Sequence, residues 1–106
     1  MYATPNYENI EFNLNTGESD YDLDAQEAEF LAVFGAANNG RLPSHVQIRT
    51  NNTISVKLNS TSNDSITITS TDSPFVITGV MISNMYLSNS SGSTAAVKLL
   101  FTDNPN

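Results

Sequence analysis

Apolar and polar residues alternate one by one along most of this chain, a period of two that is typical of β-strands with one buried face. The alternation begins at residues 10–14 and is lost at the turn residues 15–17. Alternating segments return at residues 46–50, 53–58, 66–69 and 97–101, and more continuously apolar segments at 75–77 and 80–87 also predict strands. Seven or eight short strands separated by frequent turns predict an all-β fold, an antiparallel β-sandwich of the jelly-roll kind.

Two of the connections have recognisable turn chemistry. Asn51 and Asn52 separate the strands at 46–50 and 53–58, so the pattern predicts a hairpin with a two-residue loop. Gly79 interrupts an apolar run, which predicts a bulge or a bend at that position. Residues 36–43 contain the turn signal Asn38-Asn39-Gly40 and form the main predicted loop.

Residues 24–34 carry the one helical pattern in the sequence. Asp24 is a good N-cap, Glu27 stands three positions later as in a capping box, and Gly35 is a suitable stop. We therefore expect one short helix near residues 24–34. A strand through the apolar run 30–34 is the rival interpretation, because periodicity alone does not decide so short a segment.

One predicted strand, residues 80–87, is apolar on both of its faces. Val80 and Ile82 point to one side, and Met81, Met85 and Leu87 point to the other. Leu100 likewise lies opposite its apolar neighbours on the last strand. A strand that is apolar on both faces is buried on both. The second face needs cover from the N-terminal segment or from another subunit, and Met81, Met85, Leu87 and Leu100 are the predicted subunit interface.

The N-terminal 14 residues are expected to form an extended arm that includes the first strand, with residues 15–106 as a single β-sandwich domain. Tyr2 and Tyr7 are suitable anchors for contact with a neighbouring surface. Together with Ile10 and Phe12 they make up the predicted docking arm.

Charge is sparse and unevenly distributed. The 106 residues carry a net charge of −7, and only 14% of them are charged. Residues 1–40 hold eight acidic and no basic residues, whereas residues 41–106 hold three acidic and four basic ones. Four scattered cations do not form the basic patch that nucleic acid requires, and an anionic membrane surface would repel the chain. We therefore expect neither partner.

The sequence offers little catalytic or metal-binding chemistry. It has no Cys and no Trp, and its single histidine, His45, lies outside any recognisable catalytic motif. Asp20, Asp22 and Asp24 have the spacing of the first ligands of a calcium loop, but Ala25 and Leu31 stand where such a loop has Gly and Glu. We expect a non-enzymatic protein without a cofactor or a metal site.

The chain resembles the small β-sandwich virion proteins of tailed bacteriophages. The resemblance rests on the segments ESDYDLDAQEAEFLAVFG, VQIRTNNTISVKLNSTSNDSITI, SPFVITGVMISNMYLSN and AAVKLLF, within residues 16–102. It includes a strand of the form I-x-I-R-T at Val46–Thr50 and one of the form I-x-N-x-Y-x-S/T-N at Ile82–Asn89.

The resemblance implies a structural role in a virion, as a capsid decoration or cement protein or a related head-fibre or tail component. Such proteins are often homotrimers that bind the major capsid or tail protein without catalysis. The alternative is a receptor- or carbohydrate-binding β-sandwich module, whose ligand would meet the polar loops 59–64 and 88–93.

Overall fold

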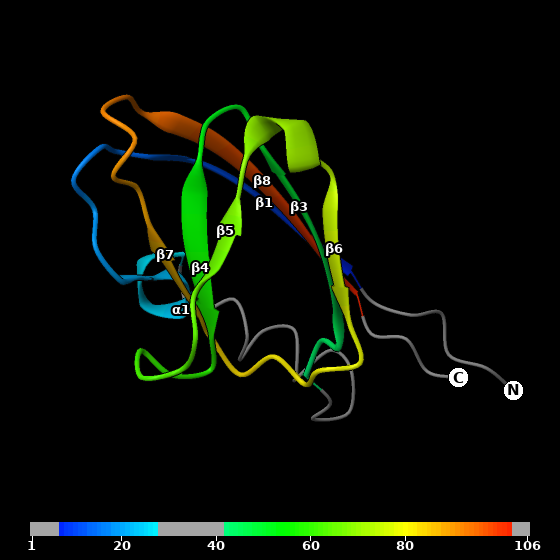
Figure 1. The fold of residues 1–106 in the computed structure, drawn as a ribbon. Coiled ribbons are helices and arrows are strands. Elements are labelled where there is room, and N and C mark those ends of the chain that lie inside the picture. Colours follow the sequence, from blue (N-terminus) through cyan, green and yellow to red (C-terminus); the bar gives the residue numbers. More distant parts are fainter. Residues whose placement is uncertain (1–6, 28–41, 103–106) are drawn as a thin grey trace, which may run out of the picture.

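The computed structural model describes residues 7–27 and 42–102, and these form two four-stranded antiparallel sheets packed face to face (Figure 1). The elements in chain order are β1 (Tyr7–Leu14), β2 (Tyr21–Asp22), α1 (Leu23–Gln26), β3 (His45–Thr50), β4 (Ile54–Leu58), β5 (Ile66–Ile68), the 3₁₀ turn η1 (Ser70–Asp72), β6 (Phe75–Thr78), β7 (Met85–Ser88) and β8 (Ala95–Thr102). The all-β sandwich expected from the alternation is confirmed. Among the described residues, no helix is long and apolar enough to cross a bilayer.

The strand order is that of a jelly roll. One sheet runs β1-β8-β3-β6 and the other runs β2-β7-β4-β5. Strands pair from the ends of the chain inward, β1 with β8, β2 with β7, β3 with β6 and β4 with β5. The chain is therefore one long folded hairpin that has been rolled up, and the β3–β8 and β4–β7 pairings close the roll.

The core lies between the two sheets and is built from the inward residues of the alternating strands. On β8 the burial alternates along the whole strand, with Ala95, Val97, Leu99 and Phe101 buried. β3 and β4 supply Val46, Ile48, Ile54 and Val56 in the same way. The alternation of apolar and polar residues along each strand thus indicates which side chains face the opposite sheet.

The predicted hairpin between residues 46–50 and 53–58 is wrong. β3 pairs with β6 and β8, whereas β4 pairs with β5 and β7, so the two strands belong to different sheets. The buried Thr50 hydroxyl donates to the Asn52 carbonyl at 2.7 Å, and Asn51 Oδ1 accepts from the Ala96 amide at 2.8 Å. These bonds hold the Asn-Asn turn against β8 while the chain crosses from one sheet to the other.

The strand predicted at 80–87 is shorter than expected. Of these residues, only 85–87 belong to β7 (Met85–Ser88), and the others form a loop. Gly79 has φ +77°, which confirms the expected bend. The loop that follows is tied down by Asn59, whose Oδ1 accepts from the Ser83 amide at 2.7 Å and whose Nδ2 donates to the Met81 carbonyl at 3.0 Å. No strand apolar on both faces exists here, since the break lets Ile82, Met85 and Leu87 share one core.

The N-cap of the helix lies two residues earlier than predicted, and the helix itself is α1 (Leu23–Gln26). Asp22, not Asp24, is the N-cap of α1, and its Oδ1 accepts from the Ala25 amide at 3.2 Å. Leu23 is fully buried, which places the start of the helix against the core. Residues 28–34 of the predicted helix, and with them the rival strand at 30–34, lie outside the described residues.

The first strand expected within the N-terminal 14 residues is present as β1 (Tyr7–Leu14), but it is part of a sheet and not an extended arm. β1 pairs with β8 along its full length, so it is an integral strand of the sandwich. Ile10 is 7% exposed in the core, and the Phe12 ring stacks on Tyr21 at a centroid distance of 5.3 Å. Ile10 is therefore not available for docking, and Phe12 is partly buried against the core. Tyr7 is 69% exposed, and Tyr2 lies outside the described residues.

Candidate functional site: the outer face of one sheet

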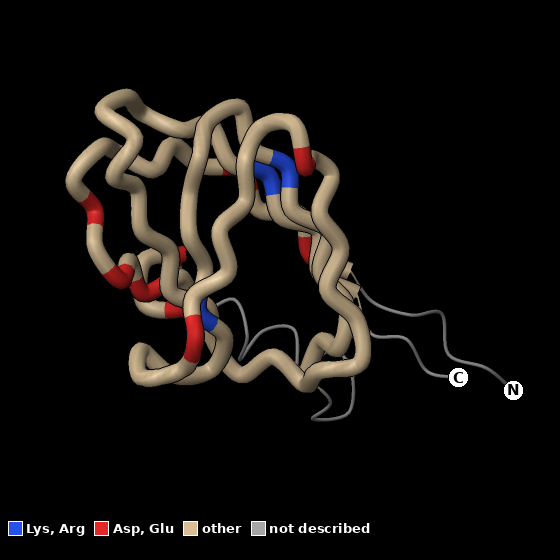
Figure 2. The backbone as a smooth tube through the Cα atoms, viewed as in Figure 1, with Lys and Arg blue, Asp and Glu red and all other residues tan. Residues whose placement is uncertain are grey.

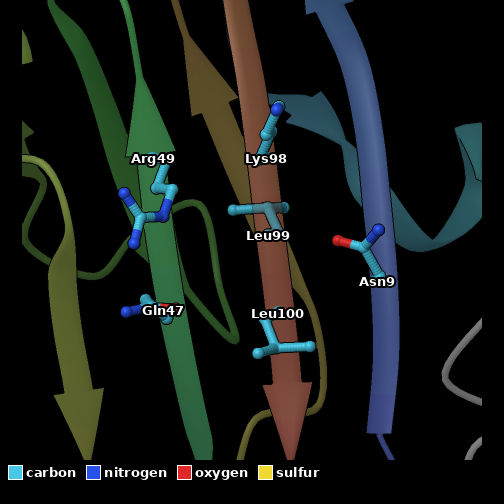
Figure 3. Close-up of a pocket in the computed structure, with 6 residues that line it drawn as sticks. All are labelled: Asn9, Gln47, Arg49, Lys98, Leu99 and Leu100. Carbon is cyan, nitrogen blue, oxygen red and sulfur yellow. The ribbon is translucent and has the colours of Figure 1, made fainter.

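The outer face of the β1-β8-β3-β6 sheet, called the outer face below, brings together side chains from strands far apart in the sequence. In one cross-strand row, Glu11 lies opposite Lys98, and Lys98 lies opposite Arg49. In the next row, Asn9 lies opposite Leu100, which lies opposite Gln47. Figure 3 shows the two cations on neighbouring strands, with the amides of Asn9 and Gln47 beside them.

These side chains line a shallow hollow of about 250 Å³ (Figure 3). Its lining is Asn9, Gln47, Arg49, Lys98, Leu99 and Leu100. Two further hollows, of about 240 and 230 Å³, adjoin it and also include Lys98. The hollows are open and mix amides, cations and aliphatic carbon, which suits contact with a surface or an acidic group better than enclosure of a small apolar ligand.

Arg49 and Lys98 are exposed and in register, and neither forms an ion pair with a described residue. The third cation among the described residues, Lys57, lies on the other sheet and contacts Asp20 Oδ1 at 3.1 Å. The Glu11 carboxylate beside Lys98 accepts from Asn9 Nδ2 at 3.1 Å. Like charges directly opposite each other on neighbouring strands are destabilising. The Arg49–Lys98 pair therefore favours a bound anionic group.

Carboxylates gather at the opposite sheet, around β2 and α1, as the red segments of Figure 2 show. We call this group the acidic edge. Its members are Glu18, Asp20, Asp22, Asp24 and Glu27, all half-buried. Several have local structural roles, since Asp22 caps α1 and accepts from Asn84 Nδ2 at 2.8 Å, and Glu27 accepts from the Tyr21 hydroxyl at 2.9 Å.

The acidic edge also affects Tyr21. Burial of the phenol, its hydrogen bond to Glu27 and the negative charges of Glu27 and Glu18 together raise its pKa to about 12. Each cause disfavours the phenolate, which cannot donate to Glu27 and is repelled by both carboxylates.

We therefore expect Tyr21 to ionise later than an ordinary tyrosine when phenolate absorbance is followed as the pH is raised. The pKa of Tyr21 is higher in the folded chain than its unfolded value near 10. The protonated phenol therefore contributes to the stability of the fold below pH 10, and this contribution is lost as the pH rises toward 12. The variant Tyr21→Phe should remove the late transition. A wild-type titration with no component above pH 11 would contradict this assignment.

The sequence-predicted site residues are divided between core and surface. Met85 and Leu87 are 0% exposed inside the sandwich, so they are wrong as subunit contacts. Met81 is 66% exposed in the loop after Gly79, and Leu100 is half-buried on the outer face. These two remain predictions, as does Tyr7.

Sequence reasoning missed the pairing of Arg49 with Lys98. Both lie at outward positions of alternating strands, which the pattern does reveal. Nothing local shows that β3 and β8 are neighbours, because the two residues are far apart in the sequence and their pairing depends on the jelly-roll order. The useful signal was that basic residues stood at outward positions of two predicted strands.

His45 is the single histidine of the chain, and Asp20, Asp22 and Asp24 have the spacing of the first ligands of a calcium loop. His45 begins β3 and is half-buried, and its buried Nδ1 atom has no hydrogen-bond partner among the described residues. No group of three or more His, Cys, Asp or Glu side chains in residues 7–27 and 42–102 is arranged to hold a metal ion.

Comparison with known protein families, curated proteins and solved structures finds no match to this chain. The jelly roll itself hosts viral capsid proteins, lectins and enzymes, so the fold alone does not select a function.

Proposed function

We propose that this chain is a non-enzymatic structural protein of a virion, of the capsid decoration, cement or related head or tail type. It oligomerises and binds the surface of the particle. The observation that carries the proposal is the outer face, an exposed four-stranded surface in which cations, amides and apolar side chains are mixed. The resemblance of the sequence to small phage virion proteins supports the same role.

The composition of this face is that of a protein–protein contact. Tyr7 is 69% exposed at one end of β1, and Val76 is 47% exposed on β6. Leu100 lies between them on β8, next to the cation row. Aromatic side chains and Arg are enriched where proteins bind one another. Binding here is adhesive, and no residue of the face is assigned a catalytic role.

The test is addition of the purified chain to particles produced without it, with bound protein measured by sedimentation. We expect the wild-type chain to bind and the variant Tyr7→Ala, which removes an exposed aromatic ring from this face and leaves Arg49 and Lys98 in place, to lose at least about tenfold in affinity, since an anchoring aromatic contact contributes about 2 kcal/mol or more. Lys57→Ala, which changes a side chain on the opposite sheet, is the control and should bind like wild type. If the chain is absent from purified complete particles and does not bind depleted ones, the proposal is wrong.

A receptor- or carbohydrate-binding module is the second candidate function. The hollow beside Arg49 favours it, because the Asn9 and Gln47 amides can donate to and accept from sugar hydroxyls. A glycan array separates the two functions. Binding that is lost in Gln47→Ala would support the module, whereas a silent array together with particle binding would support the structural role.

A further inference from the structure

We infer that the Arg49–Lys98 pair of one copy binds the acidic edge of a second copy of this chain, so that the subunits associate head to tail. This inference rests on the proposed function in one respect, because it names the partner surface through which the proposed oligomer forms. The two surfaces that would meet in this contact are the cation row of the outer face and the acidic edge around β2 and α1.

The cation pair needs a partner from outside its own subunit. Arg49 and Lys98 repel each other across neighbouring strands, and neither has an ion pair with a described residue. The adjacent carboxylate, Glu11, is a single charge for two cations. Arg forms two parallel hydrogen bonds to a carboxylate, and Lys adds a point charge beside them. The pair is therefore suited to a surface that presents several carboxylates together.

The acidic edge is such a surface. It holds five carboxylates within ten residues, and of the described cations only Lys57 forms an ion pair with it. Burial is the main cause of the raised pKa of Tyr21, and the nearby carboxylates of Glu27 and Glu18 raise it further. Carboxylates that already accept one hydrogen bond, such as Glu27, keep further lone pairs for a guanidinium.

Geometry prevents the two surfaces from neutralising each other within one subunit. The cation pair lies on the outside of the β1-β8-β3-β6 sheet, and the acidic edge belongs to the β2-β7-β4-β5 sheet and the helix that follows β2. Figure 2 shows the blue segments of β3 and β8 separated from the red segments near α1. Contact between copies must therefore join different patches, an arrangement that closes into rings such as trimers or extends into filaments.

The net charge of −7 does not prevent this association. Repulsion between whole subunits is screened beyond about 8 Å at physiological ionic strength, whereas paired side chains in contact lie about 3–4 Å apart. The contact energy is therefore dominated by the local charges at the two surfaces, which are of opposite sign.

The experiment uses two variants that each remove one surface. R49E/K98E reverses the cation pair and keeps the acidic edge. E18K/E27Q weakens the acidic edge and keeps the cation pair, and the amide oxygen that E27Q introduces still accepts from the Tyr21 hydroxyl. Asp22 and Asp20 are left unchanged because they cap α1 and pair with Lys57. Far-ultraviolet circular dichroism and thermal unfolding verify that both variants fold.

Light scattering coupled to size exclusion gives the result. We expect wild type to have a mass of at least twice the 11.5 kDa of the chain, three times if the ring is a trimer, and each variant alone to have a mass of one chain. Mixed together, the variants should form a one-to-one pair and nothing larger. The intact acidic edge of R49E/K98E can bind the intact cation pair of E18K/E27Q. The reversed cation pair of the first variant and the weakened acidic edge of the second cannot bind a further copy.

Several outcomes would overturn the inference. They are a wild-type chain that stays monomeric at its highest soluble concentration, a folded R49E/K98E variant with the wild-type mass, and a mixture of monomeric variants that does not pair. The proposed function is judged separately by binding to particles. A monomeric chain that binds particles refutes this inference and the proposed oligomerisation but not the structural role in the particle, whereas an oligomer absent from particles refutes only that structural role.

Discussion

Replacing Phe101 by Ala should lower the free energy of unfolding by about 3–5 kcal/mol, among the largest single effects expected in this chain. Phe101 is 0% exposed and is one of the largest fully buried side chains. It lies on β8, which pairs with β1 on one side and β3 on the other. The substitution therefore loses the transfer free energy of the ring and leaves a cavity between paired strands, which relax only in part.

Urea unfolding followed by circular dichroism measures the effect, and Leu100→Ala is the matched control. Leu100 is the adjacent residue on the same strand, and its side chain is half-buried on the outer face. Its truncation should cost no more than about 1 kcal/mol, because no enclosed cavity forms. Equal losses for the two variants would contradict the assignment of these side chains to opposite faces of β8.

The strands themselves could be predicted from sequence because their alternation is local. Val97, Leu99 and Phe101 stand at every second position, and all three are buried as expected. The same reasoning placed Ile66 and Ile68 on one strand, β5. One sheet face meets the core and the other does not, so polarity along the chain records the direction of each side chain.

The connections could not be predicted because local turn chemistry does not specify which sheet comes next. Asn51-Asn52 suits a hairpin, yet here Asn51 bonds to Ala96 and the chain crosses to the other sheet. Residues 79–84 look like part of a strand because they are apolar, but bonds from Asn59 hold them as a loop. In both cases the deciding contact comes from a residue more than twenty positions away.

The candidate site was harder to predict for the same reason. Apolar residues were selected as contact residues, and an apolar residue is equally suited to a core, which is where Ile10, Met85 and Leu87 lie. The cation pair depends on the pairing of β3 with β8. Strand order, which no local pattern contains, was the missing information.

Asn89 is the buried polar residue on which two loops depend. It is 1% exposed and follows β7. Its Nδ2 donates to the carbonyls of Leu14 and Ser93, both at 2.8 Å. Its Oδ1 accepts from the Ser91 hydroxyl at 2.7 Å and the Ser91 amide at 3.0 Å. The side chain thus joins the end of β1 to the loop between β7 and β8.

Asn89→Ala should lower the free energy of unfolding by about 2–4 kcal/mol, because the buried Leu14 carbonyl and the loop groups lose their partners. Urea unfolding measures this loss. Asn13→Ala, an exposed asparagine on β1, is the control and should change stability by less than about 0.5 kcal/mol. An Asn89→Ala variant as stable as this control would show that the network does not support the fold.

Asn89→Asp tests the donor group of Asn89 separately, because it replaces the side-chain Nδ2 by an oxygen and keeps the size of the side chain. The carboxylate faces two carbonyl oxygens in a buried site, so the pKa of the new acid is raised in the folded state. An acid whose folded pKa is raised contributes its stability below its unfolded pKa, near 4, and loses it as the pH rises. The loss relative to wild type should therefore be smaller at pH 3 than at pH 7. A loss that is independent of pH would mean that the carboxylate has reached solvent and that the Asn89 network opens without unfolding the sandwich.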